Sequence, residues 1–142
     1  MSPLSPTRPH SPPKGLHIAL WFVQGLLALL FVGTGLWKLV TPVSELAKMM
    51  PWMGEVSPAF FYLTAGLDTL GGLGILLPSL TRIRPKLAVL AALGCALLMA
   101  GAVVFHFTRG EGANTPFNFV LVGLSLFVAW GRHRRAPIAP RL

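Results

Sequence analysis

The chain has 142 residues, of which 54% are hydrophobic and only 11% are charged, and its formal net charge is +8. A soluble domain of this length needs far more charge to cover its surface, so the composition excludes that class and predicts a membrane protein. The single cysteine, Cys95, lies within an apolar run. This excludes a disulfide framework, a C-x-x-C redox pair and a zinc-type cysteine cluster.

The N-terminal residues 1–15 are rich in proline, which removes backbone donors and favours extended conformations. We predict that they form a disordered cytoplasmic tail. A secretory signal peptide has a shorter apolar core and a cleavage site of small residues, so we expect the next apolar segment to remain as an anchor.

The first predicted span covers about residues 18–40. At about 1.5 Å per residue it is long enough to cross a hydrocarbon core of about 30 Å. Gln24 and Thr34 are the polar groups in its interior, and Lys38 lies close to its end. A lysine near a helix end usually extends toward the lipid headgroups, and we expect this of Lys38.

Residues 41–53 differ in character from the span before them. Thr41 has the chemistry of an N-cap, Pro42 suits a first helical position, and apolar residues recur at helical spacing until Pro51. The pattern predicts a short amphipathic helix at the membrane interface. Its lipid-facing side chains are expected to be Met49, Met50, Trp52 and Met53, as a flexible apolar contact rather than a metal site.

Three further spans are predicted at about residues 58–78, 85–107 and 116–130, the last of them short for a span. The predicted fold is therefore all-α: a four-helix transmembrane bundle with a short interfacial helix between spans one and two. One membrane domain is expected over residues 16–131. A basic cytoplasmic tail is expected over residues 132–142.

The distribution of positive charge predicts the orientation. Nine of the twelve basic residues precede span one, lie between spans two and three, or follow span four; the other three are Lys38, Lys48 and Arg109. This asymmetry predicts that both termini are in the cytoplasm. We expect the protein to lie in a bacterial-type inner (cell) membrane. The basic excess indicates topology and contact with anionic lipid, and no nucleic-acid partner is expected.

Asp68 is the only acidic residue within a predicted span, and it lies near mid-membrane. A carboxylate is costly there, by roughly 3 kcal/mol on insertion scales, so its retention requires a reason. It shares a helical face with Thr64 and with the small residues Gly71 and Gly72. This face could admit a neighbouring helix or a ligand.

Three hypotheses for Asp68 remain open at this stage. It could be protonated and hydrogen-bonded to Gln24, Thr34 or a backbone carbonyl. It could form a structural ion pair with Lys38 or His106. It could also accept a proton or orient a ligand in an internal cavity, with His106 as a second titrating group.

Several segments, taken in order, carry a family resemblance. They are LWFVQGLLALLFVGTGLWKL in span one, the following AKMMPW, then AGLDTLGGLGILLP, LAALGCALLMAGAVVFHFTRGE and the terminal AWGR. Together they resemble the DoxX-like family of small four-helix membrane proteins over about residues 18–132. Lys38, Asp68 and His106 match polar positions of the family pattern, which usually has Glu where this chain has Asp68.

The resemblance implies a redox connection. Founding members are associated with a membrane thiosulfate:quinone oxidoreductase, and related small proteins assist redox enzymes or assemble other membrane proteins. We therefore predict a membrane subunit or accessory of a redox process, more a non-catalytic component than an enzyme. A quinone-like lipid is the one cofactor expected. No catalytic or metal-ligating residue is assigned, and the candidate ligand site comprises Asp68, Lys38, His106, Gln24, Thr34 and Thr64.

Two other functions stay open. A scaffold or assembly factor would hold another membrane protein, or a second copy of the chain, through its small-residue faces. A small-solute or proton carrier would need a path to both sides of the membrane, and a chain with four spans would have to form an oligomer to provide it.

Overall fold

The computed structural model describes residues 13–141, in which every regular element is helical. Most of the predicted N-terminal tail, residues 1–12, lies outside the described part. The long helices are α1 (Lys14–Val40), α4 (Pro58–Thr81), α5 (Lys86–Thr108) and α6 (Pro116–Trp130). The short ones are α2 (Val43–Met49), α3 (Trp52–Glu55), the 3-10 turn η1 (Gly112–Asn114) and the π-helical turn η2 (Gly131–Arg135).

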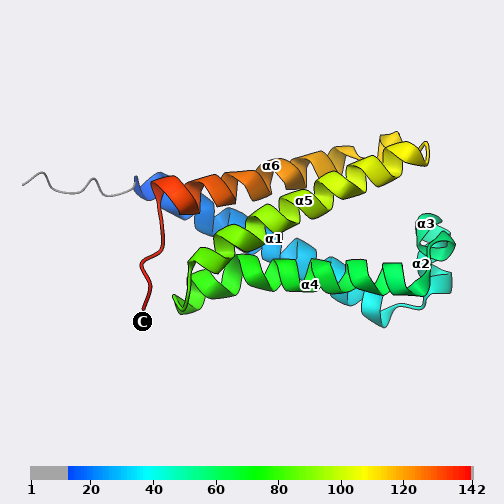
Figure 1. Ribbon diagram of the computed structural model, residues 1–142, viewed down its shortest axis with the longest axis horizontal. Coiled ribbons are helices and arrows are strands. Elements are labelled where there is room, and N and C mark those ends of the chain that lie inside the picture. Colours follow the sequence, from blue (N-terminus) through cyan, green and yellow to red (C-terminus); the bar gives the residue numbers. More distant parts are fainter. Residues whose placement is uncertain (1–12, 142) are drawn as a thin grey trace, which may run out of the picture.

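The four long helices lie roughly along one direction, with α5 and α6 side by side and α2 and α3 at one end of α4 (Figure 1). The most extensive contacts join α1 to α4, α5 to α6 and α4 to α5. All four contribute to one apolar core, which includes Leu27, Ile75, Cys95 and Val128. We call the end with α2, α3 and η1 the α3 end, and the opposite end, where η2 and the turn between α4 and α5 lie, the η2 end.

Two glycines set the close approach of α1 to α4. A Cβ atom on Gly35 would lie 2.7 Å from the carbonyl oxygen of Ala65 and 2.8 Å from the backbone nitrogen of Thr69. A Cβ atom on Gly72 would lie 2.9 Å from the backbone nitrogen of Val32. Each helix therefore presents a glycine where the other helix's backbone passes, an arrangement common between helices in membranes.

Three helices, α1, α4 and α5, are long and apolar enough to cross a membrane. Their outward faces carry large apolar side chains, such as Phe22, Leu29 and Leu97, which are each more than two-thirds exposed. A soluble monomer rarely exposes so much continuous apolar surface, whereas lipid would cover it. These helices confirm the predicted membrane character, while α6 has 15 residues and is shorter than the other three.

The segment after α1 corrects one prediction. The expected helix ends at Pro51, and α2 ends just before it, at Met49. However, α2 begins at Val43 with Pro42 rather than Thr41 in the cap position, and a second short helix, α3, follows Pro51. Met53 is 2% exposed and packs with Leu46 and Phe61, so its predicted place on the lipid side is wrong. The turn at Pro51 reverses the chain and directs α3 back onto the ends of the long helices.

Candidate functional site

A buried ion pair joins α1 to α4. Lys38 Nζ lies 2.8 Å from Asp68 Oδ2, and the two side chains are only 8% and 5% exposed. The expectation that Lys38 extends to the headgroups is wrong, because α1 and α4 approach closely enough for the lysine to reach the carboxylate. Of the three hypotheses for Asp68, the geometry matches the ion pair with Lys38.

The ion pair has a polar neighbour and an aromatic cover. Thr64 Oγ1 lies 3.5 Å from Lys38 Nζ, at the limit of a hydrogen bond, and donates to the carbonyl of Phe61. The Trp52 ring from α3 lies over the ammonium, 5.5 Å from Nζ to the ring centroid, which is a favourable cation–π distance. Trp52, predicted to face lipid, instead covers a charged group.

An aromatic cluster continues from Trp52 toward α5. Trp52 meets Phe105 edge to face at 5.6 Å between centroids, and it meets His106 in the same way at 6.0 Å. Phe105 also stacks on Phe60 of α4 at 5.9 Å. Rings from α3, α4 and α5 thus form one cluster at the α3 end, and Trp52 is the ring of this cluster that covers Lys38.

His106 belongs to a different network from Asp68. Its Nδ1 lies 2.8 Å from Glu111 Oε2, and Arg109 bonds both Glu111 and Glu55 of α3. The chain reversal after α5 brings Glu111 back to the histidine, and Arg109 links this turn to α3. His106 therefore lies near the aromatic cluster, while the structure pairs it with an acid of its own loop.

Two other predicted site residues lie elsewhere. Thr34 is exposed on α1. Gln24 is fully buried near the η2 end, where its Nε2 donates to the carbonyl of Ile75 at 2.8 Å and to Ser79 Oγ at 2.9 Å. The six predicted residues are thus divided: Lys38, Asp68 and Thr64 meet, His106 is close by, and Gln24 and Thr34 are not part of this site.

Gln24 leads to a group that the sequence analysis missed, Arg132. Its Nε donates to Gln24 Oε1 at 2.7 Å, and its Nη1 lies 3.1 Å from His17 Nδ1 and donates to the carbonyl of Ala136 at 2.9 Å. Arg132 is 4% exposed, and its guanidinium is a permanent positive charge. A run of arginines after a span resembles a topology signal, and nothing local in the sequence marks one of them as buried.

The network around Glu111 predicts a pH dependence. The hydrogen bond with His106 lowers the pKa of Glu111 below its ordinary value of 4.5; partial burial opposes this effect and Arg109 adds to it. Stability from Glu111 should therefore be complete above pH 4.5 and be lost as the pH falls through the lowered pKa. In detergent unfolding titrations, wild type should lose more stability across this interval than Glu111→Gln.

The control for this pH dependence is Glu45→Gln, because Glu45 pairs only with the exposed Lys48. Wild type and the Glu45 variant should share one pH profile. If Glu111→Gln showed that same profile, the carboxylate of Glu111 would not be coupled to folding.

An all-helical chain with three apolar helices of spanning length and a buried ion pair between two of them is an integral membrane protein. The family model of the DoxX-like family matches residues 22–128, so the chain belongs to that family. This match includes Lys38, Asp68 and His106. Comparisons with curated proteins and with solved structures gave no match.

Proposed function

We propose that the chain is a four-helix transmembrane bundle in a bacterial-type cell membrane, with both termini in the cytoplasm. The basic residues support this orientation, because the turn between α4 and α5 lies at the same end as η2 (Figure 1). Arg82 and Arg84 belong to this turn, and Lys86 follows it. In this arrangement α6 is the fourth span, extended by η2. The short helices α2 and α3 then lie at the outer interface.

We further propose that the protein is a non-catalytic membrane subunit or accessory of a redox process, and that it binds the head group of a quinone-like lipid beside Lys38 and Asp68. The observation that carries this proposal is a buried ammonium–carboxylate pair covered by Trp52, which belongs to an aromatic cluster from α3, α4 and α5. A quinone head combines flat apolar faces with carbonyl acceptors. It therefore needs aromatic or apolar walls and at least one donor.

The residues present fit those needs. A lysine ammonium has three donors, and Lys38 uses one for Asp68 and another in the long contact with Thr64. One donor remains for an acceptor such as a quinone carbonyl. Phe60 is 41% exposed, so the aromatic cluster can be reached from the lipid, and Trp52 covers the ammonium. A head group would reach Lys38 only after Trp52 moves aside.

Binding of short-chain ubiquinone and menaquinone analogues to the purified protein in nanodiscs tests this proposal. Wild type should show saturable quenching of tryptophan fluorescence, which Trp52→Phe should reduce. Substituting both Lys38→Met and Asp68→Leu should weaken binding by about tenfold, as expected for the loss of one hydrogen bond to a charged group. This double variant removes the donor without leaving an unpaired charge in the core.

The matched control is Lys48→Met, because Lys48 lies at the same end but is exposed on α2. It should bind like wild type. Equal binding by the double variant, or no saturable binding by wild type, would contradict a quinone site at Lys38.

A scaffold role has one observation in its favour. On α5, Gly94 and Gly101 are exposed, seven residues apart and without a neighbour within 4 Å of a Cβ atom placed on them. Such a face suits close packing against a helix of another chain. Gly71, by contrast, packs on Cys95 within this chain, where a Cβ atom would lie 2.7 Å from the sulfur.

Gly94→Leu therefore tests the scaffold role. The variant should fold normally and lose co-purifying membrane proteins, or self-association in crosslinking, if α5 holds a partner. If co-purification and crosslinking were unchanged, the face of α5 that carries Gly94 and Gly101 would contact lipid rather than a partner helix.

A further inference from the structure

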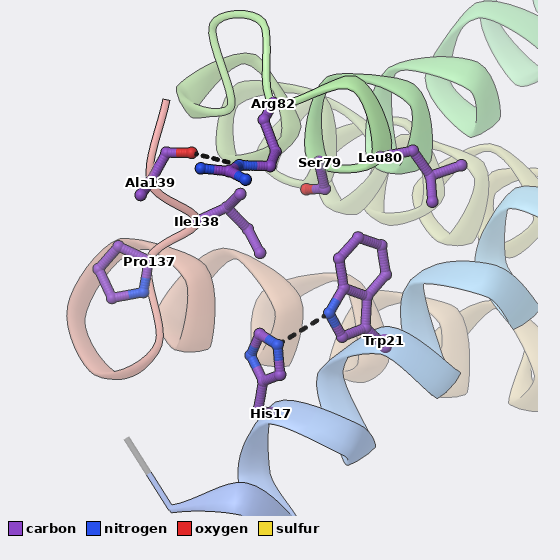
Figure 2. A pocket seen from close by; sticks show the side chains of 8 residues that line it. All are labelled: His17, Trp21, Ser79, Leu80, Arg82, Pro137, Ile138 and Ala139. Carbon is purple, nitrogen blue, oxygen red and sulfur yellow. Dashed lines mark hydrogen bonds between the residues drawn. The ribbon is translucent and has the colours of Figure 1, made fainter. Parts of the chain in front are cut away.

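A pocket of about 380 Å³ opens at the η2 end, opposite the proposed quinone site. Its walls come from three parts of the chain: His17 and Trp21 of α1, Ser79 at the end of α4 with Arg82 just beyond it, and the C-terminal segment 137–139 (Figure 2). Arg82 lies at the wall and donates from Nε to the carbonyl of Ala139 at 3.0 Å. The pocket therefore has one cationic and several polar groups on an otherwise apolar lining.

The Arg132 guanidinium lies directly behind this lining. Its Cζ is 5.0 Å from the centroid of the Trp21 ring, and its Nη1 contacts His17. Although the side chain is almost fully buried, Arg132 Nη2 has no hydrogen-bond partner within residues 13–141. A buried donor of a charged group without an acceptor is costly and calls for an explanation.

His17 shows the same shortage of acceptors. Its Nε2 lies 3.0 Å from the indole nitrogen of Trp21, which can only donate, and its Nδ1 faces Arg132, which can also only donate. A neutral imidazole offers one acceptor, so one of these two donors remains unsatisfied. The cluster thus has more donors than the described residues can satisfy.

No carboxylate side chain of the protein neutralises this cluster. The sequence contains four acidic residues, and all four have cationic partners away from it: Glu45 with Lys48, Asp68 with Lys38, and Glu55 and Glu111 with Arg109. An uncompensated buried charge is strongly destabilising. A negative charge supplied from outside these side chains would compensate the cluster.

We propose that the pocket binds a phosphate-type anion, carried by the headgroup of an anionic phospholipid or by a free phosphate. Such a group supplies several acceptor oxygens and a negative charge to Arg82 at the wall and to the field of Arg132 behind it. Leu80, which lines the pocket and is 56% exposed, continues the site toward the apolar outer surface of α4, where an acyl chain could lie. Basic pockets of this kind on the cytoplasmic side of helix bundles bind anionic lipid headgroups.

The test uses the full chain, delipidated and placed in phosphatidylcholine nanodiscs that contain increasing amounts of phosphatidylglycerol. Binding is followed by native mass spectrometry and by the fluorescence of Trp21, assigned with Trp21→Phe. Wild type should bind phosphatidylglycerol saturably, and Arg82→Gln should weaken binding by about tenfold. Arg132→Gln should weaken it at least as much. Because Arg132 is also a packing residue, the exposed Arg82 is the primary test.

The matched control is Arg84→Gln. Arg84 is exposed in the same turn, shares the left-handed backbone conformation of Arg82, and does not line the pocket. It should bind like wild type. If the Arg82 and Arg84 variants weakened binding equally, general surface charge rather than the pocket would explain the binding, and the proposal would be overturned.

Competition with inorganic phosphate distinguishes a lipid headgroup from a free phosphate as the source of the bound anion. Competition by phosphate at physiological concentration assigns the site to a soluble anion, and resistance to it assigns the site to the lipid headgroup. Both results support a phosphate-type site. If wild type showed no saturable binding of phosphatidylglycerol or of phosphate, the proposal would fail.

Discussion

Replacing Lys38 with methionine is expected to lower the free energy of unfolding by about 3 to 5 kcal/mol, the usual cost of leaving one member of a buried ion pair without its partner. Asp68 is 3% exposed, and the ammonium at 2.8 Å is its one recorded partner in the described chain. Without Lys38 the carboxylate must either remain charged among apolar side chains or take up a proton. Reversible unfolding by dodecyl sulfate in mixed micelles measures the loss.

Two further variants test whether Lys38→Met lowers stability because the ion pair is lost or because any lysine has been replaced. Replacing both partners by apolar residues, Lys38→Met with Asp68→Leu, should restore stability to within about 1 kcal/mol of wild type, because no charge then remains unpaired in the core. Lys48→Met removes an exposed lysine and should cost less than about 0.5 kcal/mol. A Lys38 variant as stable as the Lys48 variant would show that Asp68 is satisfied without its lysine.

Replacing Gly35 with alanine is expected to cost about 3 kcal/mol, at the upper end of the range for overpacking. The added methyl group would lie within 2.8 Å of two backbone atoms of α4, in Ala65 and Thr69, and backbone atoms cannot turn aside as a flexible side chain can. The helices would have to separate, which would also lengthen the Lys38–Asp68 contact one turn further along. The same unfolding titration measures the loss.

Gly33→Ala provides the comparison for Gly35→Ala. Gly33 is in the same helix, two residues away, and a Cβ atom there has nothing within 4 Å. Alanine has the higher helix propensity, so this variant should equal or exceed wild type by up to about 1 kcal/mol. Similar losses in both variants would mean that the interface between α1 and α4 tolerates an extra methyl group.

Hydrophobicity is sufficient to predict the helices of spanning length and the membrane character of the chain. The predicted spans at 18–40 and 58–78 lie within helices of spanning length, and the one at 85–107 differs from α5 by one residue at each end. An apolar run of this length has few other stable conformations in a bilayer. Depth along the spans also restricted the partners of Asp68 to a few groups, and Lys38 was among them. Depth alone could not choose between Lys38 and His106, since that choice depends on which helices touch.

The contacts around Lys38 and His106 could not be predicted from the sequence, because they depend on reversals of the chain direction. Pro51 turns α3 back so that Trp52 covers Lys38, and the loop after α5 returns Glu111 to His106. Neither reversal has a periodic signal in the sequence. Arg132 was missed for a related reason: an arginine after a span indicates topology, and its burial follows only from the π-helical turn and the packing of α6 on α1.

The long separation of Gln24 from its partners has a consequence for how the protein is made. Gln24 is 55 residues from Ser79 and 108 residues from Arg132, and Lys38 is 30 residues from Asp68. The ribosome completes α1 long before any of these partners is synthesised. The first helix must therefore leave the insertion machinery with unsatisfied polar groups, or wait there for α4. A nascent chain stalled before η2 would lack Arg132, the donor to Gln24 Oε1, and would keep this buried acceptor unsatisfied.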